Sequence, residues 1–242
     1  MSPLARRCFA EFLGTGLLVT VVVGSGIAAQ ALSIDAGLRL LENAAATAAG
    51  LAVLIVILGP VSGAHFNPVV SLADHYLGRR TRTGLSGRTL GAYVLCQTVG
   101  AIGGAVLADA MFAKAPVAWS QHRRSSPHLL LGEVVATAGL VLVIFALAGA
   151  KRTSQAPWAV GAYIGGAYFF TSSTSFANPA VTVGRAFSNT FAGIAPVSVP
   201  GFVLAELAGA VVGLGLLALL YPAAGVAADD VVVPQVGTSA RA

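Results

Sequence analysis

Two short loops with Asn-Pro at their centres constrain this chain most strongly. The first reads Ser-Gly-Ala-His-Phe-Asn-Pro-Val over residues 62–69, and the second reads Ser-Thr-Ser-Phe-Ala-Asn-Pro-Ala over 173–180. Pro directly after Asn is typical of a helix that begins at Pro and is capped by Asn. The helix-compatible stretches 67–75 and 178–187 hold roughly 10 residues, or roughly 15 Å, which is about half of a membrane's roughly 30 Å hydrocarbon core. They predict two half-helices that enter from opposite sides and meet near the midplane.

A single Asn-Pro step is most often an ordinary turn. These two are the only Asn-Pro steps in the chain, and each occupies the matching place in its half of the sequence. This repetition favours a functional pair over two unrelated turns, because membrane proteins built from inverted repeats place their broken helices in this way.

The composition supports a membrane protein. Only 10% of the residues are charged, whereas a soluble domain carries about 25%. The 29 glycines suit close packing of membrane helices. The apolar segments long enough to cross a bilayer are 4–32, 38–59, 87–113, 128–150, 156–172 and 197–221. We therefore expect one membrane domain over 1–242, with 222–242 as a loose C-terminal tail.

Basic residues between the apolar segments predict the topology. Arg6 and Arg7, the Arg-rich connection over 79–88, and the Lys151-Arg152 pair all fall on the side of the N-terminus. Because cytoplasmic loops carry an excess of Lys and Arg, both termini are expected to be cytoplasmic. The same distribution argues against nucleic-acid binding, since the net charge of +5 does not gather on one face.

The two halves, 4–113 and 128–221, repeat one another. The matching pairs are Glu11 with Thr15 against Glu133 with Thr137, and Gln97-x-x-Gly100-Ala101 against Glu206-x-x-Gly209-Ala210. Three spans and one half-helix form each half. Because three is odd, the second half must be inserted in the opposite orientation. Inverted repeats of broken helices place the functional site at their shared midplane.

The order of spans and half-helices, together with the two Asn-Pro loops, resembles the aquaporin (major intrinsic protein) family over residues 4–221. The resemblance implies an all-α membrane protein with an aquaporin-like right-handed bundle of six transmembrane helices plus two half-helices, an inverted internal repeat, and a homotetramer with one pore per protomer. The residues that match the paired NPA motifs are Asn67, Pro68 and Val69, and Asn178, Pro179 and Ala180. Val69 departs from the family's usual Ala. In most members an Arg follows the second motif, but this chain has Val181.

That Arg normally belongs to a narrow outer selectivity filter of four positions. Carrying the other positions over from the family gives Thr47, Gly166, Ser175 and Val181 as the filter of this chain. Gly165 is an alternative to Gly166, and Phe176 replaces Ser175 if the loop is displaced by one residue. All four predicted residues are small and uncharged, so a wide and rather apolar aperture is expected.

Several other residues have more than one interpretation. His65 occupies a position where family members line the pore, although a lone buried His is otherwise most often structural. Arg185 either reaches the outer vestibule or caps carbonyl groups near the interface. Glu11 and Glu133 invite a proton-relay reading, but their symmetry argues against it. The resemblance implies that they are structural braces that accept hydrogen bonds from the backbone of the Asn-Pro loops.

These features together predict a passive membrane channel for small uncharged solutes, and not an enzyme. The Arg-less filter resembles bacterial aquaglyceroporins associated with arsenic resistance, so the favoured solutes are arsenous and antimonous acid, with methylated arsenicals, glycerol and water. The alternatives are an ordinary glycerol/water facilitator and, in another class, an ion-coupled secondary transporter. We expect no cofactor, no metal and no nucleic-acid partner, and a multi-pass location in the plasma (inner) membrane.

Overall fold

The computed structural model describes residues 1–79 and 83–221, and every regular element in them is helical. The predicted tail 222–242 lies outside the described residues, as does part of the Arg-rich connection. In chain order, the helices are α1 (Pro3–Leu32), α2 (Ala36–Ser62), α3 (Pro68–Gly78), α4 (Gly87–Met111), α5 (Pro127–Gly149), η1 (Thr153–Gln155), α6 (Ala156–Phe170), α7 (Pro179–Arg185), η2 (Pro196–Ser198) and α8 (Val199–Leu220).

Most predicted spans are long apolar helices. Within the described residues, α1, α2, α4, α5 and the unit formed by η2 and α8 are long and apolar enough to cross a membrane. The span expected over 156–172 is shorter: α6 ends at Phe170 and has 15 residues, or about 22 Å at 1.5 Å per residue. Beyond Phe170 the chain turns inward as the second Asn-Pro loop.

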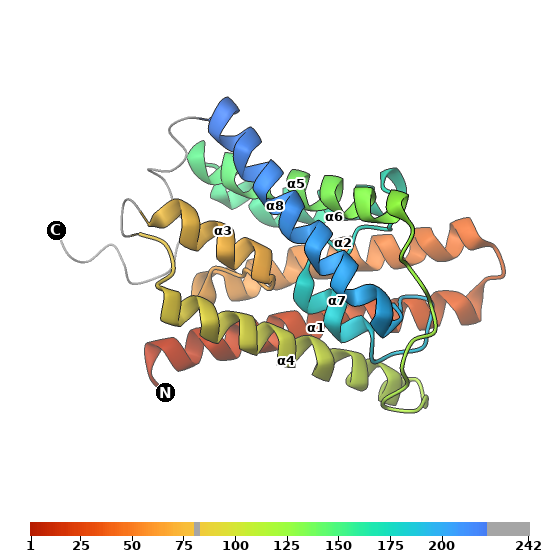
Figure 1. Cartoon of the computed structure of the whole chain (residues 1–242). Helices are drawn as coiled ribbons and strands as arrows, with labels where there is room; N and C mark the ends of the chain where they lie inside the picture. Colours follow the sequence, from red (N-terminus) through yellow and green to blue (C-terminus); the bar gives the residue numbers. More distant parts are fainter. Residues whose placement is uncertain (80–82, 222–242) are drawn as a thin grey trace.

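The two half-helices are α3 and α7. Each begins at the Pro of its Asn-Pro step, with Asn67 and Asn178 as extended N-caps whose side chains accept backbone N–H groups. α3 has 11 residues and α7 only 7, so the second half-helix ends at Arg185 rather than at the predicted residue 187. Figure 1 shows α3 and α7 approaching the middle of the bundle from opposite ends.

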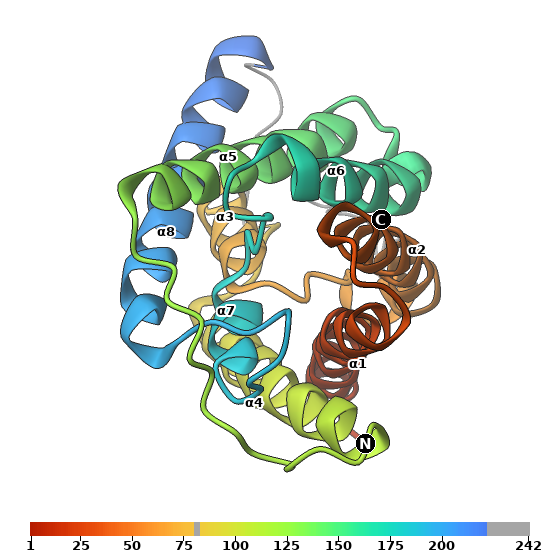
Figure 2. The same ribbon diagram turned by 90° about the vertical axis from the view of Figure 1, so that its right-hand side faces the viewer.

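The long helices surround the half-helices. Seen along the bundle in Figure 2, α1, α2, α6, α5, α8 and α4 form a ring with α3 and α7 inside it. α1 packs along α4 in the first half, and α5 packs along α8 in the second. A Cβ atom at Gly100 would overlap the carbonyl oxygen of Phe12, and one at Gly209 would lie 2.6 Å from the carbonyl oxygen of Val134. Glycine therefore permits the close backbone approach in both pairs.

Contacts also cross from one half to the other. α2 packs on α6, α7 packs on α4, and α3 touches α8 as well as α7. Each half-helix is thus held by helices of both halves, which places the two Asn-Pro loops side by side.

Candidate functional site

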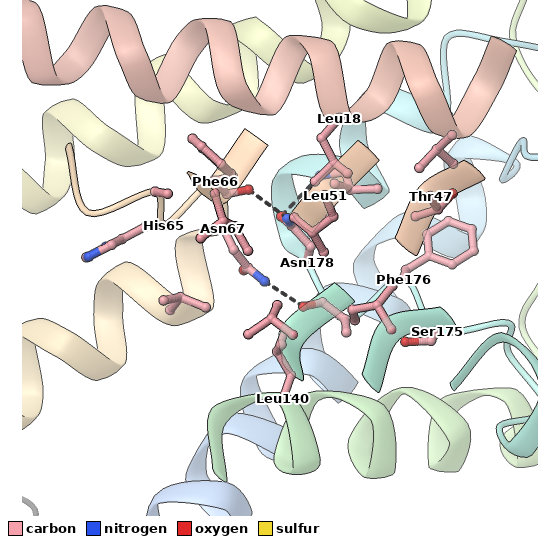
Figure 3. Close-up of a pocket in the computed structure, with 18 of the residues that line it drawn as sticks. Leu18, Thr47, Leu51, His65, Phe66, Asn67, Leu140, Ser175, Phe176 and Asn178 are labelled. Atoms are coloured by element: carbon pink, nitrogen blue, oxygen red, sulfur yellow. Dashed lines mark hydrogen bonds between the residues drawn. The ribbon is translucent and has the colours of Figure 1, made fainter. Parts of the chain in front are cut away.

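The two Asn-Pro loops are joined by a reciprocal pair of hydrogen bonds. Nδ2 of Asn67 donates to the carbonyl oxygen of Ala177 at 2.7 Å, and Nδ2 of Asn178 donates to that of Phe66, also at 2.7 Å. Figure 3 shows both bonds at the centre of the pocket. An amide NH₂ group has two donors, so each Asn keeps one N–H for a solute.

The side-chain oxygens of the same residues cap the half-helices. Oδ1 of Asn67 accepts from the backbone N–H of Val69 at 2.9 Å, and Oδ1 of Asn178 accepts from those of Ala180 and Val181 at 3.0 and 3.2 Å. The Asn side chains are therefore fixed in orientation by the helix termini on which they sit.

The loops share an unusual backbone. The residues three before and one before each Asn have positive φ: Ala64 (50°) and Phe66 (49°) in the first loop, and Ser175 (49°) and Ala177 (49°) in the second. The left-handed region costs a non-glycine residue about 1–2 kcal/mol. Such conformations persist only where the surroundings hold them.

Two buried glutamates hold the loops in this conformation. Oε1 of Glu11 accepts from Ser62 Oγ at 2.6 Å and from the N–H of His65 at 3.0 Å, while Oε2 accepts from the N–H of Phe66 at 2.7 Å. Glu133 accepts in the same way from the backbone N–H groups of Phe176 and Ala177, at 2.9 and 2.7 Å. These bonds give both glutamates a bracing position behind the loops.

The structure adds two partners that the sequence analysis treated only as repeat markers. Nε2 of Gln97 on α4 donates to Oε2 of Glu11 at 2.7 Å. Glu206 on α8 accepts the backbone N–H of Asn178 at 3.1 Å and the hydroxyl of Thr182 at 2.6 Å. The matched spacing around these two residues was the available sign of their common place behind the loops.

A cavity of about 50 Å³ lies in front of the loops. That is room for more than one water molecule, since each needs about 10–15 Å³ by the same measure. Its apolar walls come from α1, α2, α5 and α6, namely Leu18, Val22, Leu51, Ile55, Leu140, Ile144, Val160 and Ile164. The polar groups come from the two loops and, outside them, from Thr47, Tyr168 and Arg185.

His65 lies at one end of the cavity (Figure 3). It belongs to the loop that precedes α3. Its Nδ1 lies 3.0 Å from Ser71 Oγ, and its ring meets that of Tyr93 edge-on at 5.5 Å. The side chain thus lines the cavity while one ring nitrogen is held by a structural partner.

The opposite end contains most of the residues predicted for the outer filter. Thr47, Ser175 and Val181 line the cavity there, and Figure 3 places Phe176 beside Thr47. Both candidates for the loop position are therefore present, Ser175 and Phe176 together. Val69 and Ala180, by contrast, are fully buried within the packing of the half-helices.

The prediction for Gly166 is wrong. Gly166 is exposed on the outer face of α6, and a Cβ there would touch only the Phe170 ring, at 3.9 Å. Gly165 packs against α2, and a Cβ there would lie 2.9 Å from the Ala48 Cβ. The α6 residues that line this end are Ile164 and Tyr168, and the Tyr168 hydroxyl lies 3.2 Å from Thr47 Oγ1.

Arg185 is buried and lines the same end. Its Cζ atom lies 3.4 Å from the centre of the Phe176 ring, and its Nε donates to the carbonyl oxygen of Ala192. Arg124, from the connection before α5, places its Cζ 5.2 Å from the same ring. Arg185 therefore does both things considered for it: it caps a loop carbonyl and it faces the cavity.

This chain is similar to proteins of a known family. A family model described as "Major intrinsic protein" matches residues 1–177. The chain is 55% identical over 222 residues to "Aquaglyceroporin AqpS" of Rhizobium meliloti (strain 1021), covering 91% of this chain and 92% of that protein. It is 31% identical over 270 residues to the "Glycerol uptake facilitator protein" of Pseudomonas aeruginosa, covering 93% and 94%.

A solved structure shows the same fold. The X-ray structure of the aquaglyceroporin from Plasmodium falciparum aligns with a TM-score of 0.70 at 18% identity, covering 93% of this chain and 100% of that chain. At this identity the likeness concerns the fold alone.

Proposed function

The chain belongs to the major intrinsic protein family, whose members are channels and not enzymes, and from this premise we propose that it is a passive channel for small uncharged solutes. Glycerol and water are the solutes that the relatives' names support. The finer proposal is that trivalent metalloid hydroxides, arsenous and antimonous acid with methylated arsenicals, pass as well.

The observation that carries the finer proposal is Val181. This residue follows the second Asn-Pro-Ala step, is buried in the protein, and lines the outer end of the cavity without bringing a charge there. Pore diameter and lining polarity set the selectivity of such channels. A small apolar side chain at this point favours solutes wider and less polar than water.

The chemistry of the outer end suits a compact polyhydroxy solute. Phe176, Val181 and Ile164 supply apolar surface, while the hydroxyls of Thr47 and Tyr168 supply hydrogen-bond partners. Glycerol and arsenous acid both carry three OH groups, and both can place those groups against the polar side. We propose Thr47, Tyr168, Phe176 and Val181 as the filter, with Ser175 and Arg185 at its margin.

The central site accounts for the exclusion of cations. The free N–H of Asn67 and of Asn178 can donate to a hydroxyl or water oxygen, but offers nothing to a cation. Helix N-termini carry partial positive charge, and a cation that loses its hydration there is not compensated. Neutral solutes pass this point, and hydronium and metal cations do not.

The assembly and orientation are part of the same proposal. We propose two inverted repeats, 4–113 and 128–221, in one channel domain, a homotetramer, and a plasma (inner) membrane location with cytoplasmic termini. In support, the start of α1 and the ends of α3 and α5 lie at the same end of the bundle (Figure 1), and the chain carries Arg6 and Arg7, Arg79, and Lys151 with Arg152 at these points of its sequence.

Solute flux in liposomes tests the proposed function. Arsenous acid, glycerol and water are compared for the native chain, for Val181→Arg, and for Val181→Leu as an uncharged control. Val181→Arg should lower arsenous acid and glycerol flux by at least about tenfold and spare water, because it narrows the outer end and adds a second cation beside Arg185. Val181→Leu should keep most of the flux of all three.

Other outcomes identify the rivals. Glycerol flux without arsenous acid flux indicates an ordinary glycerol facilitator. Flux that follows an imposed proton or sodium gradient indicates an ion-coupled transporter. A native chain that passes only water, or nothing, means that Phe176 and Arg185 close the outer end and that the proposal is wrong.

A further inference from the structure

Two buried carboxyl groups lie side by side behind the second Asn-Pro loop. Glu133 accepts from the backbone N–H groups of Phe176 and Ala177 at 2.9 and 2.7 Å. Glu206 accepts from the next one, that of Asn178, at 3.1 Å. The two carboxyl groups are thus anchored on consecutive residues, and when both are ionised they repel each other.

The first half shows what occupies this place when no second acid is present. The corresponding residues of the two halves are Glu11 and Glu133, Gln97 and Glu206, and Ser71 and Thr182. Nε2 of Gln97 donates to Glu11 at 2.7 Å and lies 3.0 Å from Ser71 Oγ. The first half therefore has one carboxylate, that of Glu11, and one amide donor that faces it, that of Gln97.

Glu206 keeps the contact with the hydroxyl but brings no amide donor. Its Oε1 accepts from Thr182 Oγ1 at 2.6 Å, in the place of the contact between Gln97 and Ser71. Its Oε2 is buried and has no hydrogen-bond partner within the described part of the chain. An ionised oxygen left without a donor in the interior is costly, whereas a protonated oxygen is itself a donor.

We propose that Glu206 is a positioning residue that carries a proton on Oε2 in the folded channel and directs it to Glu133, as the amide of Gln97 does to Glu11. The pair then holds a single negative charge, as the first half does. The bound proton keeps the N–H of Asn178 and the hydroxyl of Thr182 paired with Oε1. The second loop is thereby fixed in the same shape as the first.

Arg185 attracts both carboxyl groups of the pair and Arg124 attracts Glu133, but both guanidinium groups donate their hydrogen bonds to other oxygens. Arg185 on α7 donates to the Ala192 carbonyl and lies on the Phe176 ring. Arg124 donates to the carbonyl oxygens of Gly193 and Ser173.

The titratable groups on α3 and α6 also have partners of their own. On α3, Asp74 accepts from the N–H of Leu85, and His75 bonds to the Leu85 carbonyl. On α6, the Tyr168 hydroxyl faces Thr47. None of these groups donates to Oε2 of Glu206 in the described part of the chain, so a bound proton is the simplest donor at this oxygen.

The proton predicts a direction of pH dependence. A glutamate in an unfolded chain loses its proton above about pH 4.3, whereas the folded chain keeps the one on Glu206. Each pH unit above that value therefore shifts the equilibrium toward the unfolded chain by up to about tenfold, until the folded protein loses the proton too. Stability should fall as the pH rises.

The test compares Glu206→Gln with the mirror variant Gln97→Glu. Glu206→Gln supplies a permanent donor, so glycerol flux should stay within about twofold of the native value and the stability should lose most of its pH dependence. The infrared carbonyl band of a buried protonated carboxyl should disappear. Gln97→Glu should add such a band and make stability fall more steeply with pH.

Glu206→Leu separates the positioning role from the proton. It leaves the N–H of Asn178 and the hydroxyl of Thr182 unpaired, so flux should fall by more than about tenfold. A native protein without the infrared band, or a Glu206→Gln variant with unchanged pH dependence, overturns the proposal. The infrared and unfolding measurements need no solute, so they stand apart from the proposed solute preference.

Discussion

The α6 residues that face the cavity are separated by one helical turn. Val160, Ile164 and Tyr168 line it, while Gly166 lies on the outside of the same helix. Residues four apart share a helix face, and residues two apart do not. A non-helical loop separates α6 from Asn178, so a position carried over from the family by its distance from Asn178 does not determine which face of α6 a residue occupies.

This placement is tested by adding bulk on the two faces. Gly166→Leu should leave glycerol flux unchanged, because the new side chain points away from the cavity. Ile164→Trp should lower the flux by at least about tenfold, because it fills the outer end. Stopped-flow light scattering on liposomes measures both. Equal loss in the two variants would show that Gly166 does belong to the filter.

Phe176 brings an aromatic ring to the outer end of the cavity. It lies beside Thr47 and carries the Arg185 guanidinium on its ring. Phe176→Leu should therefore raise the flux of solutes larger than glycerol, because the ring is removed and Arg185 loses its support.

A matched control for Phe176→Leu is Phe202→Leu. Phe202 meets the Phe176 ring edge-on at 5.1 Å but does not line the cavity. It should change stability and not the solute size limit. A size limit that moves equally in both variants contradicts the assignment of Phe176 to the aperture.

At the scale of elements, the braces depend on close pairs of helices. Glu11 and Gln97 meet because α1 and α4 approach at Gly100, and Glu133 and Glu206 meet because α5 and α8 approach at Gly209. Any residue with a side chain at the contact glycine separates the helices. The brace and the loop it holds are then displaced together.

Gly100→Ala tests this dependence, with Gly103→Ala as its control. A Cβ at Gly100 would overlap the Phe12 carbonyl oxygen, whereas one at Gly103 meets nothing within 4 Å. We expect Gly100→Ala to lower the free energy of unfolding by about 1–3 kcal/mol through overpacking. Gly103→Ala should be neutral or stabilising by up to about 1 kcal/mol. Thermal unfolding in detergent reads out both, and a neutral Gly100→Ala would show that the contact is unimportant.

At the scale of the whole molecule, the outer faces of the helices are apolar. Leu204, Val211 and Leu219 on α8 are 67%, 70% and 80% exposed. An apolar surface of this extent suits lipid or another subunit rather than water. The polar residues are instead gathered inside, around the two loops.

The arrangement in the membrane can be checked by labelling from one side. In a Cys8→Ser, Cys96→Ser background, Ser126→Cys and Ser154→Cys place thiols at the two ends of α5. A membrane-impermeant reagent added outside intact cells should label the thiol at 126 and not the one at 154, because α5 spans the bilayer. Labelling of both from outside would contradict the proposed topology.

The sequence by itself determined the spans, the half-helices and the pairing of the halves. These follow from local rules: apolar length, Asn capping before Pro, and the repeated spacing of Glu, Gln and Gly. The residues that meet at the centre, Asn67 and Asn178, were predictable because each sits at the start of a half-helix. The order of spans and half-helices along the chain is enough to place both Asn residues near the midplane.

Only the tertiary structure decided the outer end of the cavity and the partners behind the loops. Tyr168 and not Gly166 lines the cavity, because the direction of a side chain depends on the rotation of its helix. The packing of α6 against α2 and α5 sets that rotation. Arg185 lies on the Phe176 ring, where the end of α7 meets the second loop. Glu206 became a neighbour of Glu133 because helices far apart in sequence pack closely. Such contacts depend on where whole helices lie, and no local pattern carries that information.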